Sequence, residues 1–182
     1  AGPGVATVTV TGKGELADNV FTTTFNVYRR VKSITSTNSQ YIDTGIVPGP
    51  NTAVEMYFNT TNSVDNTAYF GAGAYNANNS YVFYPAGGFY YFRGAGTTTG
   101  LQNEQGVDGF VSISTNAADN LHFSLGGNAV TKTVALTYAG SNKLNIFASN
   151  NGGNKSKLTL YSFKIWQNGE LVRDFVPVRG NA

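Results

Sequence analysis

The residues best suited to chemistry are aromatic, amide and guanidinium side chains that gather in the middle of the chain. They are Tyr75, Asn79, Tyr84, Tyr91 and Arg93, in a stretch with few other charges. A tyrosine ring can stack on the apolar face of a sugar, and amide and guanidinium groups can hydrogen-bond to its hydroxyls. These residue types predict a site that binds a ligand by stacking and hydrogen bonding, without a chemical step.

The order of the aromatic residues before Arg93 predicts which of them reach the surface. Alternate residues of a strand point to opposite faces, so Phe89, Tyr91 and Arg93 share one face and Tyr90 and Phe92 share the other. We expect Tyr90 and Phe92 to face the core. The rings of Phe89 and Tyr91 and the guanidinium group of Arg93, which carries several hydrogen-bond donors, would then lie on the outer face. The reverse assignment, in which the other rings form the core, is the alternative.

Catalytic carboxylates are not apparent. Retaining glycosidases need two carboxyl groups about 5 Å apart, and sandwich glucanases supply them from alternate residues of one strand. No acidic residue of this chain has a second one two positions away. The pairs Glu104/Asp108 and Glu170/Asp174 are four positions apart, a spacing that suits a helix rather than a strand. We interpret both pairs as solvated charges on loops or on the surface.

Nucleophilic, thiol and phosphate-binding chemistry also lack their usual residues. The chain has no cysteine and one histidine, His122, which we expect on the outer face of a strand between two inward-facing residues. The stretch Gly71-Ala72-Gly73 resembles part of a dinucleotide-binding loop, but no helical pattern follows it. The sequence therefore predicts a protein that is not an enzyme.

Calcium is the one cofactor that the sequence leaves open. Asp65-Asn66 and Asp119-Asn120 offer oxygen ligands, although neither stretch has the spacing of an EF-hand loop. Asp and Asn also favour turns, and we take turn formation as the main role of both pairs. No cofactor is assigned from the sequence.

Charge and hydropathy argue against two classes of partner. Lys and Arg number 12 against 10 Asp and Glu, for a net charge of +2. This near balance disfavours nucleic-acid binding, which depends on many cationic contacts with phosphate. No apolar run approaches the ~18 residues that a membrane-spanning helix needs.

Because Ala1 begins the chain without a signal-like apolar core, we expect a piece of a larger protein.

The elements that must position these residues are short strands. The chain contains 22 Gly, 11 Tyr and 12 Phe and is rich in Thr and Asn, which favours strands and turns over helices. Apolar and polar residues alternate over 5–11 and again over 21–27. The Gly- and Asp-containing stretch 12–19 joins them, and this pattern predicts an N-terminal hairpin.

A domain boundary is predicted near residue 30. The basic residues Arg29, Arg30 and Lys32 follow the hairpin, and a polar stretch comes after them. We expect residues 1–30 to form the hairpin and residues 31–182 to form the main domain.

Strand-like segments recur through the main domain at intervals of roughly ten residues, which is typical of a β-sandwich. The pair Asn168-Gly169 predicts a tight hairpin turn. Leu158 and Leu160 alternate in one phase and Phe163 in the other, which predicts a β-bulge between them. The sequence therefore predicts an all-β fold, a two-sheet antiparallel sandwich preceded by a hairpin.

Two ends of the main domain resemble a known family. Residues 160–178 (LYSFKIWQNGELVRDFVPV) resemble the closing strand pair of laminin-G-like domains of bacterial surface and phage proteins, in the concanavalin A-like lectin/glucanase superfamily. Residues 39–45 and 54–56 are similar to the opening of those domains. The resemblance covers roughly residues 33 to 179. It implies a two-sheet jelly roll with a concave face that is often carbohydrate-binding and often noncatalytic.

The chain also departs from that family. Gly73 stands where the family leads us to expect an arginine, and the carboxylate motif of the glucanases is missing. Residues 4–27 resemble the last two strands of a bacterial immunoglobulin-like repeat, without the rest of the repeat. The resemblance therefore implies a noncatalytic branch and a hairpin fragment before the main domain.

Two functional hypotheses follow from these observations. The first is a carbohydrate-binding module of a larger bacterial or phage protein, binding a poly- or oligosaccharide through Tyr75, Asn79, Tyr84, Tyr91 and Arg93. The second is a structural or adhesive module of a surface adhesin or phage tail fibre. Both predict an extracellular, cell-surface or virion location, with the neighbouring domains of the parent chain as partners.

Overall fold

A computed structural model gives the fold, and it describes residues 4–11, 20–27, 29–59, 67–74, 79–94, 97–102, 109–114, 120–125, 128–133, 138–149 and 151–179. The chain consists of two compact units. One is Ser33–Phe175, and the other combines Ala1–Lys32 with Val176–Ala182. The predicted division into separate domains, residues 1–30 and residues 31–182, stays a prediction.

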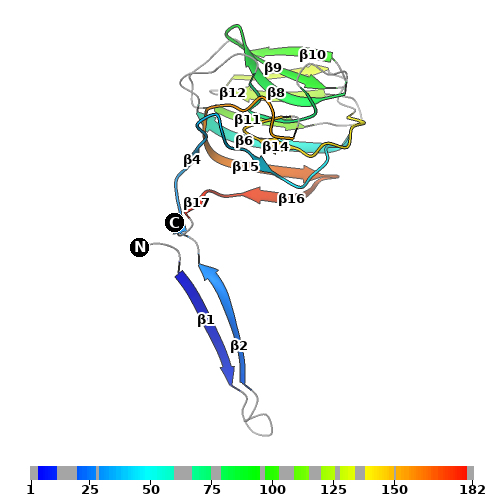
Figure 1. The fold of residues 1–182 in the computed structure, drawn as a ribbon. Coiled ribbons are helices and arrows are strands. Elements are labelled where there is room, and N and C mark those ends of the chain that lie inside the picture. Colours follow the sequence, from blue (N-terminus) through cyan, green and yellow to red (C-terminus); the bar gives the residue numbers. More distant parts are fainter. Residues whose placement is uncertain are drawn as a thin grey trace. The chain divides into compact units, whose positions relative to one another are not determined.

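The smaller unit contains a β-hairpin and a short strand pair. β1 (Gly4–Thr11) and β2 (Val20–Val27) pair in antiparallel fashion, drawn in blue in Figure 1. β-Branched Val and Thr along both strands favour extended backbone. β3 (Arg29–Arg30) pairs with β17 (Val178–Arg179) from the other end of the chain. The predicted N-terminal hairpin is confirmed, and its loop, residues 12–19, lies outside the described residues.

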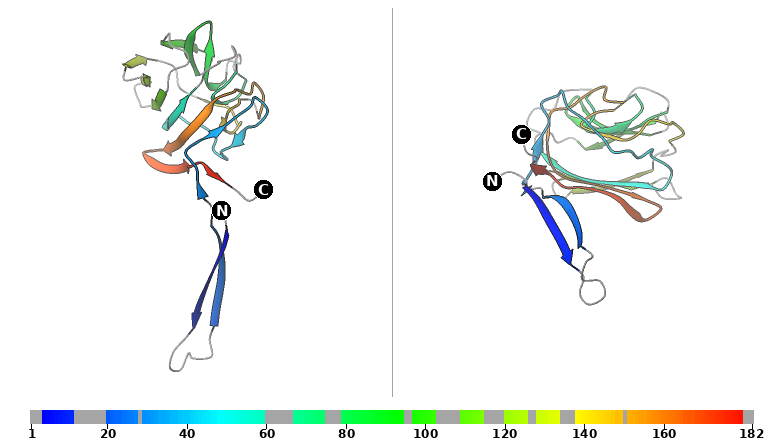
Figure 2. Two further views of the ribbon diagram at one scale, coloured as in Figure 1. Left: turned by 90° about the vertical axis from the view of Figure 1, so that its left-hand side faces the viewer. Right: turned by 60° about the horizontal axis from the view of Figure 1, so that its bottom comes forward.

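The larger unit is a sandwich of two antiparallel sheets. The six-stranded sheet has the spatial order β10 (Thr97–Gln102), β9 (Phe89–Gly94), β8 (Tyr81–Ala86), β7 (Phe70–Ala72), β14 (Asn145–Ile146) and β5 (Ile42–Asp43). The five-stranded sheet consists of β11 (Gly109–Ser114), β6 (Thr52–Asn59), β15 (Thr159–Gln167) and β16 (Glu170–Phe175), with β4 (Ile34–Thr35) on β15. The right-hand view of Figure 2 shows the two sheets as two layers.

One further hairpin accompanies the sandwich. β12 (Asn120–Leu125) and β13 (Asn128–Thr133) pair with each other in antiparallel fashion. Leu121 and Phe123 of β12 are buried in the core of the sandwich, whereas His122 between them is exposed. The outward orientation predicted for His122 is therefore confirmed. All described elements are strands, so the predicted all-β, antiparallel sandwich fold is confirmed too.

The core between the sheets is built largely from aromatic rings. In β6, Val54, Met56 and Phe58 are fully buried and alternate with residues that reach the surface. From the opposite sheet, Phe83 stacks on Tyr90 with ring centroids 5.6 Å apart. Each large side chain buried in this way stabilises the fold by about 1.5–3 kcal/mol. The fully buried aromatic side chains are Phe58, Tyr69, Phe70, Tyr81, Phe83, Tyr90, Phe92, Phe123 and Phe163.

Two local features of β15 follow from its sequence. Its pairing with β6 shifts register between Leu160 and Ser162, and this irregularity keeps both Leu160 and Phe163 in the core. The predicted bulge is confirmed. Asn168 and Gly169 then connect β15 to β16 with φ values of 51° and 82°, the left-handed backbone that the turn requires.

Candidate functional site

One face of the six-stranded sheet points away from the core, and we call it the outer face. Directly paired residues of neighbouring strands share a face, so the pairing register defines a row across it. The row runs through Asp43, Asn145, Gly71, Val82, Arg93 and Thr98. Strands lie 4.7–4.9 Å apart, so this row spans about 24 Å from β5 to β10.

The β8–β10 end of the outer face carries a group of rings. Tyr84 of β8 and Tyr91 of β9 are directly paired, and their rings stack with centroids 5.7 Å apart and planes at 23°. Phe89 lies 6.2 Å from Tyr91 on the same face and is 41% exposed. Tyr84 is only 6% exposed, whereas Tyr91 is half-buried. Tyr84 therefore backs the Tyr91 ring.

Gly100 of β10 lies on the other flank of Tyr91. It pairs directly with Tyr91, and a Cβ built on it would lie 3.4 Å from Cε1 of that ring. Because glycine has no side chain, nothing from this position covers the ring. We call Tyr84, Phe89, Tyr91, Arg93, Thr98 and Gly100 the aromatic patch.

Arg93 is held in place at the edge of this patch. Its Nη1 donates a hydrogen bond to Oγ1 of Thr98, its partner on β10, at 3.0 Å. The guanidinium group remains charged at any physiological pH and presents several donors in a fixed plane. A ligand lying on Tyr91 would therefore meet a hydrogen-bonding side chain that is already oriented.

The structure brings three of the five predicted site residues together. Tyr84, Tyr91 and Arg93 lie on adjacent strands of the outer face, and the inward orientation predicted for Tyr90 and Phe92 is confirmed, since both are fully buried. Oδ1 of Asn79 accepts a hydrogen bond from the backbone N–H of Ala139 at 3.0 Å, so this side chain supports a loop. Tyr75 lies outside the described residues.

Gly73, where the sequence lacks the expected arginine, has a physical reason to be glycine. Its φ is +77°, and a Cβ there would lie 2.7 Å from the carbonyl oxygen of Asn79. L-residues rarely adopt this backbone conformation, and the space for a side chain is already filled. Gly73 therefore offers no side-chain contact to a ligand.

The middle of the outer face is covered by another part of the chain. A Cβ on Gly71 would lie 3.0 Å from Cβ of Ser149 and 2.9 Å from Cγ2 of Val82. The backbone N–H of Ala68 donates to the carbonyl of Asn154 at 2.7 Å, and Ala68, Val82 and Tyr84 form a small buried cluster. The segment around Ser149 thus lies over the centre of the row and separates its two ends.

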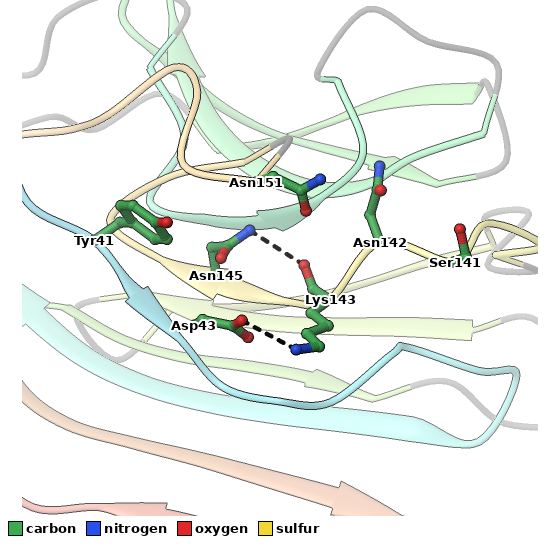
Figure 3. A pocket seen from close by; sticks show the side chains of 7 residues that line it. All are labelled: Tyr41, Asp43, Ser141, Asn142, Lys143, Asn145 and Asn151. Atoms are coloured by element: carbon green, nitrogen blue, oxygen red, sulfur yellow. Dashed lines mark hydrogen bonds and ion pairs between the residues drawn. The ribbon is translucent and has the colours of Figure 1, made fainter.

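The β5–β14 end of the outer face contains a polar pocket with a volume of about 350 Å³. Figure 3 shows the side chains around it, which come from β5, the residue before β5, β14 and the loops that precede and follow β14. The residues that line it are Tyr41, Asp43, Ser141, Asn142, Lys143, Asn145 and Asn151.

Hydrogen bonds and an ion pair fix several of the polar groups that line this pocket. Lys143 and Asp43 form an ion pair with Nζ and Oδ2 3.3 Å apart. The backbone N–H of Gly45 donates to Oδ1 of Asp43 at 2.8 Å, and this bond together with Lys143 holds the pKa of Asp43 below its ordinary value. Asn145, 2% exposed, donates from Nδ2 to the carbonyl of Lys143 at 3.2 Å.

Tyr41 forms one wall of the pocket. It is 45% exposed, and a Cβ on Gly152 would lie 2.6 Å from Cε1 of its ring, so only glycine allows this approach. Nζ of Lys155 lies 5.8 Å from the centroid of the same ring, within the range of a cation–π interaction. The ring therefore has a defined position at the rim.

Sequence reasoning missed this pocket. Asp43 and Asn145 are about a hundred residues apart, and they become neighbours only because β5 pairs with β14, each strand being two residues long. Strands this short carry no alternation from which their faces can be read. A weak signal was the group of amides at Asn142, Asn145 and Asn151.

Metal ligands are not grouped in the part of the chain that the structure describes. No set of three or more His, Asp or Glu side chains there could hold an ion. Asp65, Asn66, Asp119 and the Asn120 side chain lie outside the described residues, so calcium binding by these pairs stays untested. His122 instead lies 2.9 Å, through Nδ1, from Oγ1 of Thr131.

Among the described residues, no helix has the length and apolar character needed to cross a membrane. The charged side chains that the structure describes are at least partly exposed to solvent.

Comparison with known proteins identifies fold neighbours. No protein-family model matches the chain, and no curated protein matches it. A point mutant of the NanB sialidase from Streptococcus pneumoniae has a similar structure, with a TM-score of 0.57 and 15% identity over 84% of this chain and 28% of that chain. The same sialidase in complex with a substituted ammonioethanesulfonate gives 0.56 and 14%, over 80% and 26%. The chain therefore spans about a quarter of the sialidase chains, and the likeness shows the fold.

Proposed function

We propose that this chain is a noncatalytic carbohydrate-binding module of a larger extracellular bacterial or phage protein. The observation that carries the proposal is the surroundings of Tyr91, whose ring is backed by Tyr84, flanked by a glycine and adjacent to Arg93. A sugar stacks on a ring that is rigid and open on one side, and it needs a hydrogen-bonding group beside that ring.

In this proposal the residues of the aromatic patch have different roles. Tyr91 and Phe89 contact the apolar face of a sugar, and Arg93 and Thr98 hydrogen-bond to its hydroxyls. Tyr84 is too buried to contact much of a ligand, and it positions Tyr91 instead. Because the rings and Arg93 are already packed or hydrogen-bonded, little side-chain entropy is lost on binding.

The family and the setting belong to the same proposal. We assign the sandwich to the laminin-G-like branch of the concanavalin A-like superfamily on its opening and closing motifs, 39–45 and 160–178. The likeness to a module of a sialidase, an enzyme that acts on glycans, supports a role in glycan recognition. Neighbouring domains of the parent protein would bring several weak sites together and raise the avidity.

A second candidate function is protein–protein adhesion through the five-stranded sheet. On the face of that sheet turned away from the core, Tyr57 is 39% exposed and packs against Tyr161 with ring centroids 4.8 Å apart. Leu171, in β16, is 49% exposed. An exposed aromatic ring and an exposed leucine on one sheet are also found at protein interfaces.

Binding of the purified chain to a panel of soluble and insoluble polysaccharides, with and without calcium, tests the proposal. We expect retention on one class of polysaccharide, and we expect Tyr57→Ala to be retained like the unaltered chain. Absence of retention across the panel would contradict the carbohydrate proposal and favour the adhesive one. Calcium-dependent retention that Tyr91→Ala leaves unchanged would also contradict it, because the site would then lie elsewhere.

A further inference from the structure

The polar pocket at the β5–β14 end of the outer face has no part in the site proposed above. We propose that it is a second saccharide site, which takes a single neutral hexopyranose residue. The inference deepens the proposed function and rests on it for the class of ligand. It differs in place, since the segment around Ser149 separates the pocket from the aromatic patch.

The size and the shape of the pocket suit one sugar ring. Its volume of about 350 Å³ lies at the small end of the range for ligand pockets. Tyr41 supplies an exposed aromatic wall, and the remaining lining side chains are all polar. A hexopyranose presents the same combination, an apolar ring face bordered by hydroxyl groups.

The polar groups are oriented before any ligand arrives. The hydrogen bond from Asn145 Nδ2 to the Lys143 carbonyl fixes the amide plane, and Figure 3 shows Oδ1 of Asn145 on the side of Tyr41 and Asp43. Asn151 and Asn142 supply further amides on the opposite side of the pocket. Amides both donate and accept, as a hydroxyl does, so these side chains match a polyhydroxylated ligand.

Charge selects a neutral ligand. Asp43 and Lys143 are the two charged side chains that line the pocket, and their ion pair leaves this lining without net charge. Lys155 contacts the Tyr41 ring but lies outside the lining. An anionic sugar would place its carboxylate beside the carboxylate of Asp43, whose pKa the Gly45 N–H holds below its ordinary value. A metal cation would meet the Lys143 ammonium group. A neutral sugar can accept from Lys143 and donate to Asp43 without either penalty, as charge-assisted hydrogen bonds are strong.

The test uses the full chain in solution and the side-chain amide signals of its asparagines. Methyl glycosides of glucose, galactose and mannose are titrated in ¹H–¹⁵N correlation spectra, with glucuronate and N-acetylneuraminate as anionic probes. We expect at least one neutral glycoside to shift the signals of Asn145 and Asn151, and we expect neither anionic probe to do so. Shifts from the anionic probes alone, or no shift at these amides, would overturn the inference.

Two variants test whether such shifts come from binding in the pocket. Asn151 has a φ of 55°, so Asn151→Gly removes the amide without straining the backbone. We expect this variant, and Asn142→Ala, each to lower the affinity about fivefold, the effect of one lost hydrogen bond. Asn38→Gly is the matched control, because Asn38 is also exposed at positive φ but lies outside the pocket.

The outcomes separate this inference from the proposed function. Unchanged affinity in both Asn151→Gly and Asn142→Ala would overturn the pocket site even if polysaccharide binding depends on Tyr91. Conversely, a glycoside can bind in the pocket while polysaccharide binding is insensitive to Tyr91→Ala. In that case the site proposed at the aromatic patch is wrong and the pocket site stands.

Discussion

Alternate residues of β9 have very different surroundings, although they are neighbours in the sequence. Tyr90 and Phe92 are fully buried and pack against other rings of the core, Phe83 and Tyr81 among them. Tyr91, between them, lies on the outer face and is half-buried. One strand therefore supplies stability from one side and a candidate binding surface from the other.

The two sides also differ in what a truncation would leave behind. Tyr90 is surrounded by rings from several strands, including Phe58 and Phe123. Removing such a ring would leave a cavity in a close-packed interior. Tyr91 has a ring on one flank and a glycine on the other, so solvent would replace it. Stability and binding are therefore expected to separate in variants of adjacent residues.

The largest effect is expected on the inward side. Phe92→Ala should lower the free energy of unfolding by about 3–5 kcal/mol, because a fully buried ring is replaced by a cavity. Urea denaturation measures this change, and Phe92→Leu, which keeps most of the volume, should cost much less. A loss below about 1 kcal/mol for Phe92→Ala would mean that the ring is not part of a packed core.

Tyr91→Ala should produce the opposite result. We expect the affinity for the polysaccharide that the panel identifies to fall about thirtyfold, or ~2 kcal/mol, as for an aromatic anchor of a binding site. The free energy of unfolding should fall by about 0.5–1.5 kcal/mol, the contribution of the Tyr84–Tyr91 ring pair. Calorimetric titration and urea denaturation of the same protein give both values. Equal affinity of the variant and the parent chain would contradict a binding role for the outward-facing side of β9.

Gly100 allows Tyr91 to be tested without changing Tyr91. A valine at this position should cover the flank of the ring, because a Cβ there already lies 3.4 Å from Cε1. We expect Gly100→Val to lower the affinity about tenfold. The melting temperature should not fall, since valine favours an exposed strand and the φ of Gly100 is not positive. Gly100→Ala should have an intermediate effect, and an undiminished affinity for valine would contradict stacking at this flank.

Arg93→Lys should have a smaller effect. Lysine keeps the positive charge but loses the planar set of donors, one of which bonds to Thr98. We expect the affinity to fall about fivefold, corresponding to one lost hydrogen bond. The stability should change little because the side chain is partly exposed. An affinity equal to that of the parent chain would show that charge alone, rather than the shape of the guanidinium group, matters here.

The smallest effect is expected at Tyr84. Its ring supports Tyr91, and the side chain is almost entirely buried. Tyr84→Phe keeps the ring and should change the affinity by less than about twofold. A larger loss would show that the hydroxyl group of Tyr84 contacts the sugar directly, as the sequence predicts for this residue.

The parts of the fold that could be predicted depend on local patterns. The alternation of β9 placed Tyr90 and Phe92 in the core, and the phase change after Leu160 predicted a bulge. Asn168-Gly169 predicted its turn because few other residues tolerate positive φ at both positions. In each case the signal lies within a few residues of the feature.

The parts that could not be predicted depend on contacts between distant segments. Tyr84 shares the outer face with Tyr91, but it is buried in a small cluster with Ala68 and Val82. The polar pocket needs β5 and β14 side by side, and nothing in either two-residue strand indicates its partner. Alternation assigns a residue to a face, whereas its exposure depends on what else covers that face.

Locating the sugar on the protein tests directly whether Tyr91 forms the binding site. Intermolecular nuclear Overhauser effects can be recorded between the ring protons of the tyrosines and an oligosaccharide of the class that the panel identifies. We predict contacts from the sugar C–H protons to the Tyr91 ring and to the Hα protons of Gly100, and none to Tyr57 or Tyr161. Contacts to Tyr57 and Tyr161 in place of Tyr91 would contradict the account, because the glycan would then bind the opposite sheet.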